Sequence, residues 1–135
     1  MTGGPVSKQV ILFLCEHNAG RSQLASALMA HRTKDRFEVR SAGTDPSEHV
    51  SEAVATSLGE LGIDISGRIP RRVTEADLRE ADVVVTMKPG LKLPAPPAGR
   101  LVGWSFPDPL GWDIEGIRPL RNQIDAAVQE LASEL

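Results

Sequence analysis

Segments with the pattern of strands alternate along the chain with segments that have the pattern of helices. Residues 8–14 (KQVILFL) are an apolar, β-branched run of strand length between polar flanks, which is typical of a buried strand. Further strands are expected at residues 37–40, 82–87 and 100–104. Strands that alternate with helices build βαβ units. The sequence therefore predicts an α/β fold, a four-stranded parallel sheet with helices on both faces.

Apolar side chains recur at helical spacing between and after these strands. Residues 22–32 carry one apolar face, and residues 74–80 begin at Thr74, a good N-cap, with Asp77 at the third helical position. Two further helical stripes consist of Val50, Val54, Leu58 and Leu61, and of Ile117, Leu120, Ile124, Val128 and Leu131. Turns or loops are expected at residues 41–44, 63–73 and 88–99.

Length and composition suit one globular domain. The chain has 135 residues, 41% of them hydrophobic, and a formal net charge of −3. We expect a single domain over residues 8–135 that follows a flexible leader at residues 1–7. A slightly acidic chain has no basic field for nucleic acid, its apolar runs are too short to span a bilayer, and the leader lacks the pattern of a secretory signal. We therefore expect a cytoplasmic protein with no nucleic-acid or membrane partner.

The chain has one cysteine, Cys15, which excludes internal disulfides and multi-cysteine zinc sites. The three histidines, His17, His31 and His49, show no metal-ligand spacing, and we expect no metal site. The motifs GxSxG, GxxxxGKS and GxxxxGKT do not occur, which argues against the usual serine hydrolases and nucleotide-binding P-loops. A lone cysteine that ends a strand is often a small buried hydrophobe, so its neighbours decide its role.

Those neighbours have the character of an oxyanion-binding loop. They are Glu16, His17, Asn18, Ala19, Gly20, Arg21 and Ser22. Backbone N–H groups in such a loop converge on an anion, and the N-terminus of the following helix adds partial positive charge. Gly20 gives the backbone freedom near the anion, and the Arg21 guanidinium binds two anion oxygens. Because the same field favours the thiolate of Cys15, the segment predicts a nucleophile beside a bound oxyanion.

Other polar side chains near this loop are expected to play supporting roles. The Ser22 hydroxyl is expected to donate to the thiolate, and the Asn18 side chain to bond to the loop backbone. We expect the Glu16 side chain to point away, with only its N–H turned inward. His17 is expected to shape the loop without acting as a base. A solvated loop is the interpretation of the basic residues Arg68, Arg71 and Arg72.

The spacing C-x5-R-S after a first strand resembles the low-molecular-weight protein tyrosine phosphatase family. The longer string CEHNAGRSQLASAL at residues 15–28 is similar to the arsenate reductase branch of that family. Weaker matches follow in the family's order at residues 41–44 (SAGT), 61–64 (LGID), 81–87 (ADVVVTM) and 108–109 (DP). The resemblance covers nearly the whole chain. It implies a phosphatase-type oxyanion loop after the first strand, with Cys15, Arg21 and Asp108 as catalytic residues.

The resemblance implies that Cys15 attacks an oxyanion held by the loop and Arg21, while Asp108 protonates the departing oxygen. Pro107 and Pro109 flank Asp108 and stiffen its loop. In thioredoxin-coupled arsenate reductases two further cysteines resolve the adduct, and this chain lacks both. The expected enzyme is an arsenate reductase with no bound cofactor. Its adduct is resolved by an external low-molecular-weight thiol such as mycothiol, with a glutaredoxin-like redox protein as partner.

Two alternatives stay open. The same three residues serve a low-molecular-weight phosphatase, in which water hydrolyses a cysteinyl phosphate. Family members that act on phosphotyrosine carry aromatic residues just after the Asp-Pro pair, whereas this chain has Leu110 and Gly111 there, with Trp112 next. The other alternative is a non-catalytic oxyanion-binding regulator, which has no need of a nucleophile. The chain also has Ser26 where some relatives carry an acidic residue of a potassium site.

Overall fold

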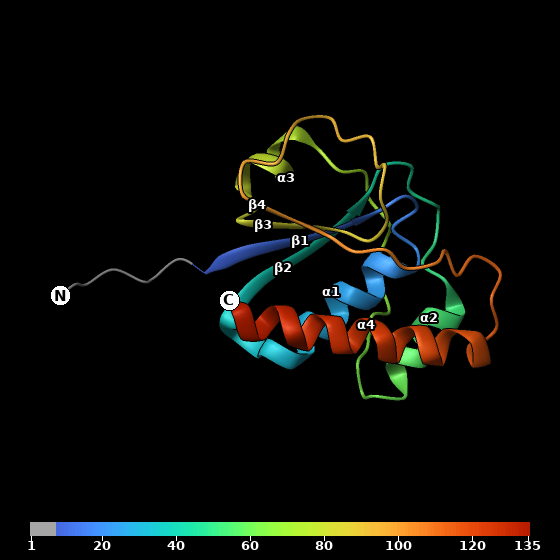
Figure 1. Ribbon diagram of the computed structural model, residues 1–135. Coiled ribbons are helices and arrows are strands. Elements are labelled where there is room, and N and C mark those ends of the chain that lie inside the picture. The colour runs from blue at the N-terminus through green and yellow to red at the C-terminus, as the bar shows by residue number, and fades with distance from the viewer. Residues whose placement is uncertain (1–7) are drawn as a thin grey trace.

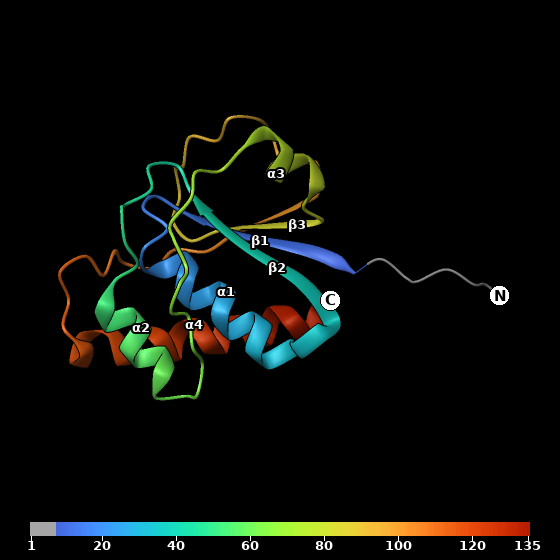
Figure 2. The same cartoon turned by 180° about the vertical axis from the view of Figure 1, so that it is seen from behind.

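The computed structural model describes residues 8–135, so the leader expected at residues 1–7 lies outside the described residues. One parallel sheet in the order β2-β1-β3-β4 is formed by β1 (Gln9–Cys15), β2 (Phe37–Gly43), β3 (Val83–Thr86) and β4 (Arg100–Gly103). The helices are α1 (Arg21–Thr33), α2 (Glu52–Gly59), α3 (Glu75–Glu80) and α4 (Ile114–Glu134), with a short 3-10 turn at Lys34–Arg36. The predicted α/β fold is confirmed: α1, α2 and α4 cover one face of the sheet and α3 the other (Figures 1 and 2).

Burial of β1 on both faces explains its unbroken apolar run. Successive strand side chains point to opposite faces. Ile11 and Phe13 pack in the larger core with α1, α2 and α4, whereas Leu12 and Leu14 pack in the smaller core with α3. Cys15 has the same parity as Ile11 and Phe13 and belongs to the larger core. The alternation therefore places the sulfur on the α1 side, at the carboxyl edge of the sheet.

The turn predicted at residues 41–44 is wrong in its first three residues. Residues 41–43 continue β2, because they pair with β1 as far as Cys15. A Cβ atom on Gly43 would lie 2.5 Å from the Glu16 carbonyl oxygen and 2.9 Å from the Asn18 nitrogen. Only glycine lets the end of β2 lie this close to the loop after β1. Strand pairing here overrides the local turn pattern.

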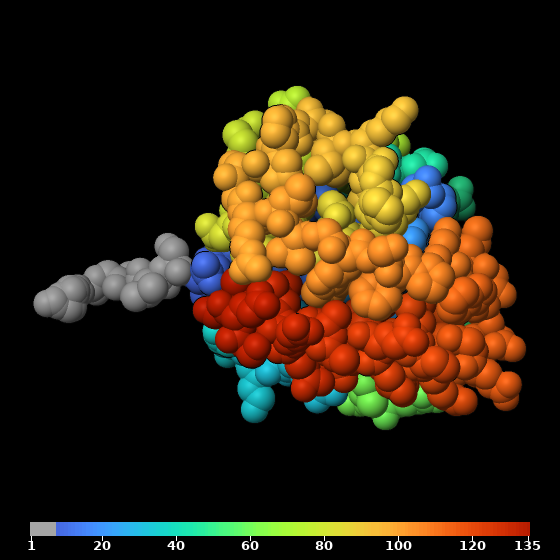
Figure 3. All heavy atoms as spheres, in the orientation of Figure 1, coloured from blue at the N-terminus to red at the C-terminus, as the bar shows by residue number. Residues whose placement is uncertain are grey.

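The α3 face of the sheet is covered in part by irregular chain. The predicted cap of α3 is confirmed: the Thr74 hydroxyl accepts from the Asp77 N–H at 3.1 Å, and the Asp77 carboxylate accepts from the Thr74 N–H at 2.8 Å. The proline-rich loop after β3 adds Leu91, Leu93 and Ala95 to this core. Figure 3 shows the segment between β3 and α4, in yellow to orange, above α4 in red. Among residues 8–135, no helix combines the length and apolarity needed to cross a membrane.

The ionic contact between Glu60, the C-cap residue of α2, and α4 carries a testable pH dependence. The Glu60 carboxylate accepts from Arg118 at 2.6 Å and from Arg121 at 2.8 Å. Arg118 and Arg121 lower the pKa of the Glu60 carboxyl from 4.5 to about 2. A carboxyl with a lowered pKa in the folded state stabilises the fold above its ordinary pKa and loses that contribution as the pH falls through the lowered value.

We therefore expect Glu60→Gln to lower the free energy of unfolding at neutral pH, because it removes this charge from both arginines. The difference from the unsubstituted protein should shrink as the pH falls from 4.5 toward 2. Urea denaturation at several pH values measures it. Glu134→Gln, which removes the exposed partner of Arg100, is the matched control. A Glu60→Gln difference that stays constant over this pH range would contradict the assignment.

Candidate active site

The loop between β1 and α1 has its carbonyl groups turned outward. Four of its backbone carbonyl oxygens accept from backbone N–H groups of the segment after β2: Cys15 from Thr44 (3.2 Å), Glu16 from Asp45 (2.7 Å), His17 from Ser47 (3.0 Å) and Ala19 from Ser51 (3.0 Å). A fifth, that of Asn18, accepts from the Gln23 side chain at 2.9 Å. In a trans peptide the N–H group points opposite to the carbonyl, and no described peptide of residues 8–135 is cis. The N–H groups of residues 16–20 therefore point to the inner side of the loop.

The Cys15 sulfur lies on this inner side, next to the Asn18 N–H. The side chain is 2% exposed, and Sγ accepts from the Asn18 N–H at 3.2 Å. Sγ also lies 2.9 Å from the Ser22 hydroxyl oxygen. That oxygen accepts from the Asn18 side-chain amide at 2.8 Å, which leaves the hydroxyl hydrogen to be donated to a thiolate. Two donors thus converge on the sulfur, as a nucleophilic thiolate requires.

The Asn18 side chain differs from its expected role. Its amide nitrogen donates to Ser22, and its Oδ1 accepts from the Arg71 backbone N–H at 3.0 Å, so neither contact is to the loop backbone. Asn18 also has a φ of +52°, in the left-handed region, where Asn is tolerated better than most residues. The residue is 1% exposed and ties the loop to the chain before α3.

Gly20 has a packing role beside the one expected. Its φ of −132° lies outside the left-handed region. A Cβ atom on Gly20 would lie 2.9 Å from the Pro109 ring. Glycine is needed because the Asp-Pro segment packs directly on the loop. This contact brings Asp108 over the start of α1.

Arg21, the first residue of α1, joins the loop to the same Asp-Pro segment. The residue is 5% exposed, and its Nη1 donates to the Phe106 carbonyl at 3.0 Å. A guanidinium has five N–H donors in a fixed fork, so this bond orients the group and leaves further donors for an anion. Arg21 also lines the pocket above Cys15.

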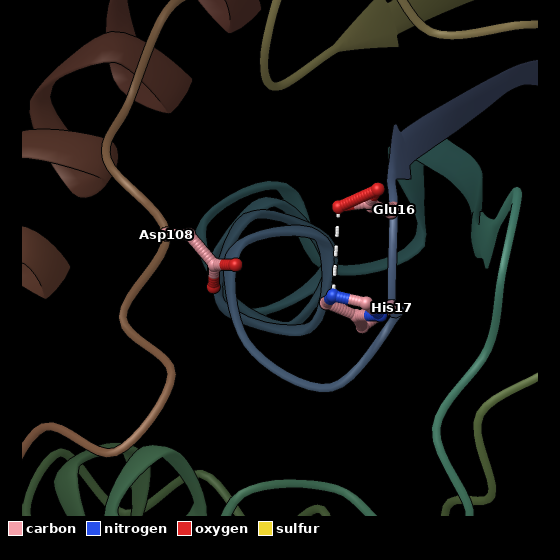
Figure 4. Close-up of side chains that lie close together, drawn as sticks. All are labelled: Glu16, His17 and Asp108. Atoms are coloured by element: carbon pink, nitrogen blue, oxygen red, sulfur yellow. Dashed lines mark ion pairs between the residues drawn. The ribbon is translucent and has the colours of Figure 1, made fainter.

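Asp108 is exposed and enters the site from the segment before α4. Its Oδ1 accepts from the Leu110 N–H at 3.1 Å, so the residue also makes the local turn that Asp-Pro sequences favour. Figure 4 shows its carboxylate across the start of α1 from Glu16 and His17. Asp108 and Cys15, 93 residues apart in the sequence, thus line one pocket.

The expected direction of the Glu16 side chain is wrong. One carboxylate oxygen each of Glu16 and Asp108 and one ring nitrogen of His17 lie within 4.8 Å of one another, and Glu16 is 3.5 Å from His17 Nε2 (Figure 4). His17 Nδ1 lies 3.1 Å from the Asp45 carbonyl oxygen, which fits the expected role in shaping the loop. The three groups have the donor atoms of a cation site, although the spacing of the histidines gave no such signal. Exposed acidic groups also gather without a metal, so the cluster alone assigns none.

The pocket above Cys15 has a volume of about 380 Å³. Beside the predicted residues it is lined by four that the sequence analysis missed, Ser47, Glu48, His49 and Ser51. Only Ser51 had a local signal, as the N-cap of α2, where it accepts from the Val54 N–H. Among the residues described as lining this pocket, none is Phe, Tyr or Trp; Trp112, which is 38% exposed, lies beside Gly116.

The basic segment before α3 makes more specific contacts than a solvated loop. All three arginines are exposed, as expected. Arg68 nevertheless donates to the Gln23 and Ser26 side chains, and Arg71 forms a two-pronged ion pair with Asp77. Arg72 donates to the Thr44 carbonyl at 2.7 Å. The segment therefore makes hydrogen bonds to α1 and to the residue that follows β2, and so helps to fix the chain around the loop.

Comparison with protein families gives one assignment over nearly the whole chain. The model of the family described as "Low molecular weight phosphotyrosine protein phosphatase" matches residues 10–135. An arsenate reductase of Shouchella clausii is 36% identical over 138 residues, which cover 94% of this chain and 97% of the relative.

Solved structures agree with this assignment. A thioredoxin-dependent arsenate reductase of Corynebacterium glutamicum has a TM-score of 0.81 and 35% identity over 94% of this chain. The match spans only 61% of that protein's chain. An arsenate reductase in a phosphate-binding state has a TM-score of 0.82 and 28% identity, and the match covers 93% of this chain and 98% of that one.

Proposed function

The chain belongs to the low molecular weight phosphotyrosine protein phosphatase family, and on that premise we propose that it is an arsenate reductase that acts in the cytoplasm. Cys15 is the nucleophile, residues 16–22 bind the oxyanion, and Asp108 is the general acid. An external low-molecular-weight thiol, such as mycothiol, resolves the adduct, and a glutaredoxin-like protein completes the reduction.

The observation that carries this proposal is the direction of the peptide groups around Cys15. Four of their carbonyls bind the segment 44–51, so their N–H groups point to the inner side of the loop, where the Asn18 N–H contacts the sulfur. A tetrahedral oxyanion placed there would meet those donors, the N-terminus of α1 and the Arg21 guanidinium. A loop built only to bind an anion has no need of a sulfur with two donors of its own. The arrangement therefore supports catalysis over a non-catalytic regulator.

The chemical step begins with attack of the Cys15 thiolate on arsenic. A sulfur–arsenic bond forms, an arsenic–oxygen bond breaks, and the departing oxygen leaves as water after taking a proton from Asp108. Arsenic stays in its +5 state in the resulting adduct, so this step is a transfer and not yet a reduction. Reduction needs two electrons, which must come from thiols outside the chain.

Two observations favour arsenate over a phosphorylated protein as substrate. The relatives reported above at 30% identity or more are named arsenate reductases. The described residues that line the pocket include no aromatic ring of the Phe, Tyr or Trp type to hold a phosphotyrosine. Phosphate and arsenate have the same shape and charge, so the loop itself does not separate them.

A pair of turnover assays tests the proposal against the phosphatase alternative. Arsenate consumption is measured with a panel of low-molecular-weight thiols and a glutaredoxin-like protein, and aryl-phosphate hydrolysis is measured without thiols. We expect sustained arsenate turnover and weak hydrolysis. No arsenate turnover with any thiol, together with rapid hydrolysis, would assign the protein as a phosphatase.

Replacing Asp108 by asparagine is expected to slow the reaction while leaving oxyanion affinity nearly unchanged. The amide has no proton to give to the departing oxygen, and general acid catalysis contributes about 10² to 10⁴ in rate. Stopped-flow kinetics of adduct formation measures the effect. Asp113→Asn is the matched control, since asparagine also caps helices well and Asp113 caps α4 in the same segment. A near-normal rate in Asp108→Asn would mean that Asp108 only stabilises the local turn and is not the general acid.

A further inference from the structure

A second cavity of about 380 Å³ lies beside Asn18 of the loop, and its described lining residues all differ from those of the catalytic pocket. Its lining includes Asn18, Gln23, Ser26 and Arg68. Three of these residues are buried, with exposed fractions of 1% for Asn18, 1% for Gln23 and 2% for Ser26. Arg68 reaches them from an exposed segment. The cavity therefore contains a polar network that the reaction itself does not touch.

Hydrogen bonds lead through this network from Arg68 to Asn18, whose own N–H contacts the Cys15 sulfur. Arg68 Nη1 donates to the Gln23 side-chain oxygen at 3.2 Å and to the Ser26 hydroxyl at 3.0 Å. The Gln23 side-chain nitrogen donates to the Asn18 carbonyl at 2.9 Å. The Asn18 N–H then donates to Cys15 Sγ at 3.2 Å. The Asn18 carbonyl and N–H belong to the two peptide groups on either side of its Cα, so the backbone conformation of Asn18, with φ of +52°, connects the last two contacts.

The guanidinium of Arg68 differs from the other two at this cavity in the groups that it binds. The other two arginines around this cavity bind carboxylates, Arg40 those of Glu38 and Glu80 and Arg71 that of Asp77. Arg68 binds only neutral side-chain oxygens among the described residues, and burial lowers the pKa of its guanidinium. The group gives up hydration to donate to the buried Gln23 oxygen, which has no other side-chain or backbone donor among residues 8–135.

We propose that Arg68 is a positioning residue that, through Gln23, holds Asn18 in the left-handed conformation that aims its N–H at the Cys15 sulfur. With Arg68 removed, the Gln23 amide loses the donor that orients it and no longer anchors the Asn18 carbonyl. The peptide group that contains this carbonyl also contains the Ala19 N–H, one of the N–H groups that point to the inner side of the loop. The thiolate and the oxyanion site therefore both depend on the contact between Gln23 and the Asn18 carbonyl. The proposal rests on the proposed role of Cys15 as nucleophile.

The test measures the thiolate directly, without substrate turnover. Alkylation of Cys15 by iodoacetamide is followed at about pH 6 in Arg68→Met, Gln23→Met and the double variant, with phosphate affinity measured in parallel. We expect each single variant to be alkylated roughly tenfold more slowly, the scale of one hydrogen bond to a charged group. The double variant should be no slower than either single one, because both break the same chain.

Two comparisons separate positioning from loss of positive charge or of stability. Gln23→Met changes no charge, so an effect of this variant on alkylation does not come from lost positive charge. Arg100→Met removes an exposed arginine whose carboxylate partner is Glu134, and its alkylation rate should match that of the unsubstituted protein. In Arg68→Ala, added guanidinium ion should restore much of the alkylation rate by entering the cavity. If Arg68→Met does not fold, Arg68→Lys is used, and an intermediate rate is expected.

Unchanged alkylation in Arg68→Met or Arg68→Lys would overturn the proposal, as would additive effects in the double variant. Because alkylation involves neither arsenate nor a phosphate ester, these outcomes are independent of which reaction the enzyme catalyses. Failure of arsenate turnover with a normal effect of Arg68 on alkylation would instead refute only the proposed substrate.

Discussion

Cys15→Ser is expected to abolish turnover of arsenate and of aryl phosphates while the protein still binds phosphate. In the proposed mechanism the sulfur is the nucleophile, and loss of an enzyme's nucleophile lowers kcat by up to about 10⁶. The groups proposed to hold the anion are separate from the sulfur. They are the inward N–H groups of loop peptides whose carbonyls accept from residues 44–51, and the Arg21 guanidinium, which donates to the Phe106 carbonyl. Steady-state kinetics and calorimetric titration with phosphate measure the two quantities.

The substitution itself is mild in structural terms. Cys15 is 2% exposed, and a serine hydroxyl at this place still meets the Ser22 hydroxyl and the Asn18 N–H. Circular dichroism and the urea midpoint should therefore stay close to those of the unsubstituted protein. Retained turnover in Cys15→Ser would exclude a thiolate mechanism. Loss of phosphate binding together with turnover would mean that the sulfur is part of the anion site.

Arsenate turnover is expected to require a low-molecular-weight thiol and to fail with thioredoxin and its reductase alone. The chain has one cysteine, and the arsenic of the Cys15 adduct is still in its +5 state. A thiol RSH first takes the arsenic from Cys15, which regenerates the thiolate and gives an RS–arsenate conjugate. A redoxin thiolate then attacks the RS sulfur. The sulfur–arsenic bond breaks, and its two electrons stay on arsenic, which leaves as arsenite. The two sulfurs form a mixed disulfide, and their oxidation accounts for both electrons.

The measurement compares arsenite release with thioredoxin, glutathione and mycothiol systems side by side. The rate should depend on the thiol and on pH, because attack is fastest when the pKa of the attacking thiol lies near the ambient pH. The C. glutamicum relative is named thioredoxin-dependent, and the match spans only 61% of its chain, so the thioredoxin arm is a demanding control. Robust turnover with thioredoxin and no small thiol would refute the external-thiol mechanism.

Local sequence was sufficient for the parts of this protein that depend on neighbours along the chain. The parity of the apolar run before Cys15 follows from the two-residue period of a strand, and it places the sulfur on the α1 side of the sheet. The cap of α3 by Thr74 and Asp77 involves residues three apart. The spacing of Cys15 and Arg21 around a strand end and a helix start likewise indicated the oxyanion loop. In each case one short segment contains all the interacting groups.

The remaining features depend on hydrogen bonds between segments that the sequence keeps far apart. The loop's N–H groups point inward because residues 44–51 bind its carbonyls, and β2 continues to Gly43 because it pairs with β1. Arg68 meets Gln23 from 45 residues away, and Glu16 turns toward an Asp108 that lies 92 residues further along the chain. Spacing and propensity report only on groups within a few residues of each other. The direction of a peptide or of a flexible charged side chain is decided by partners that only the folded chain brings within reach.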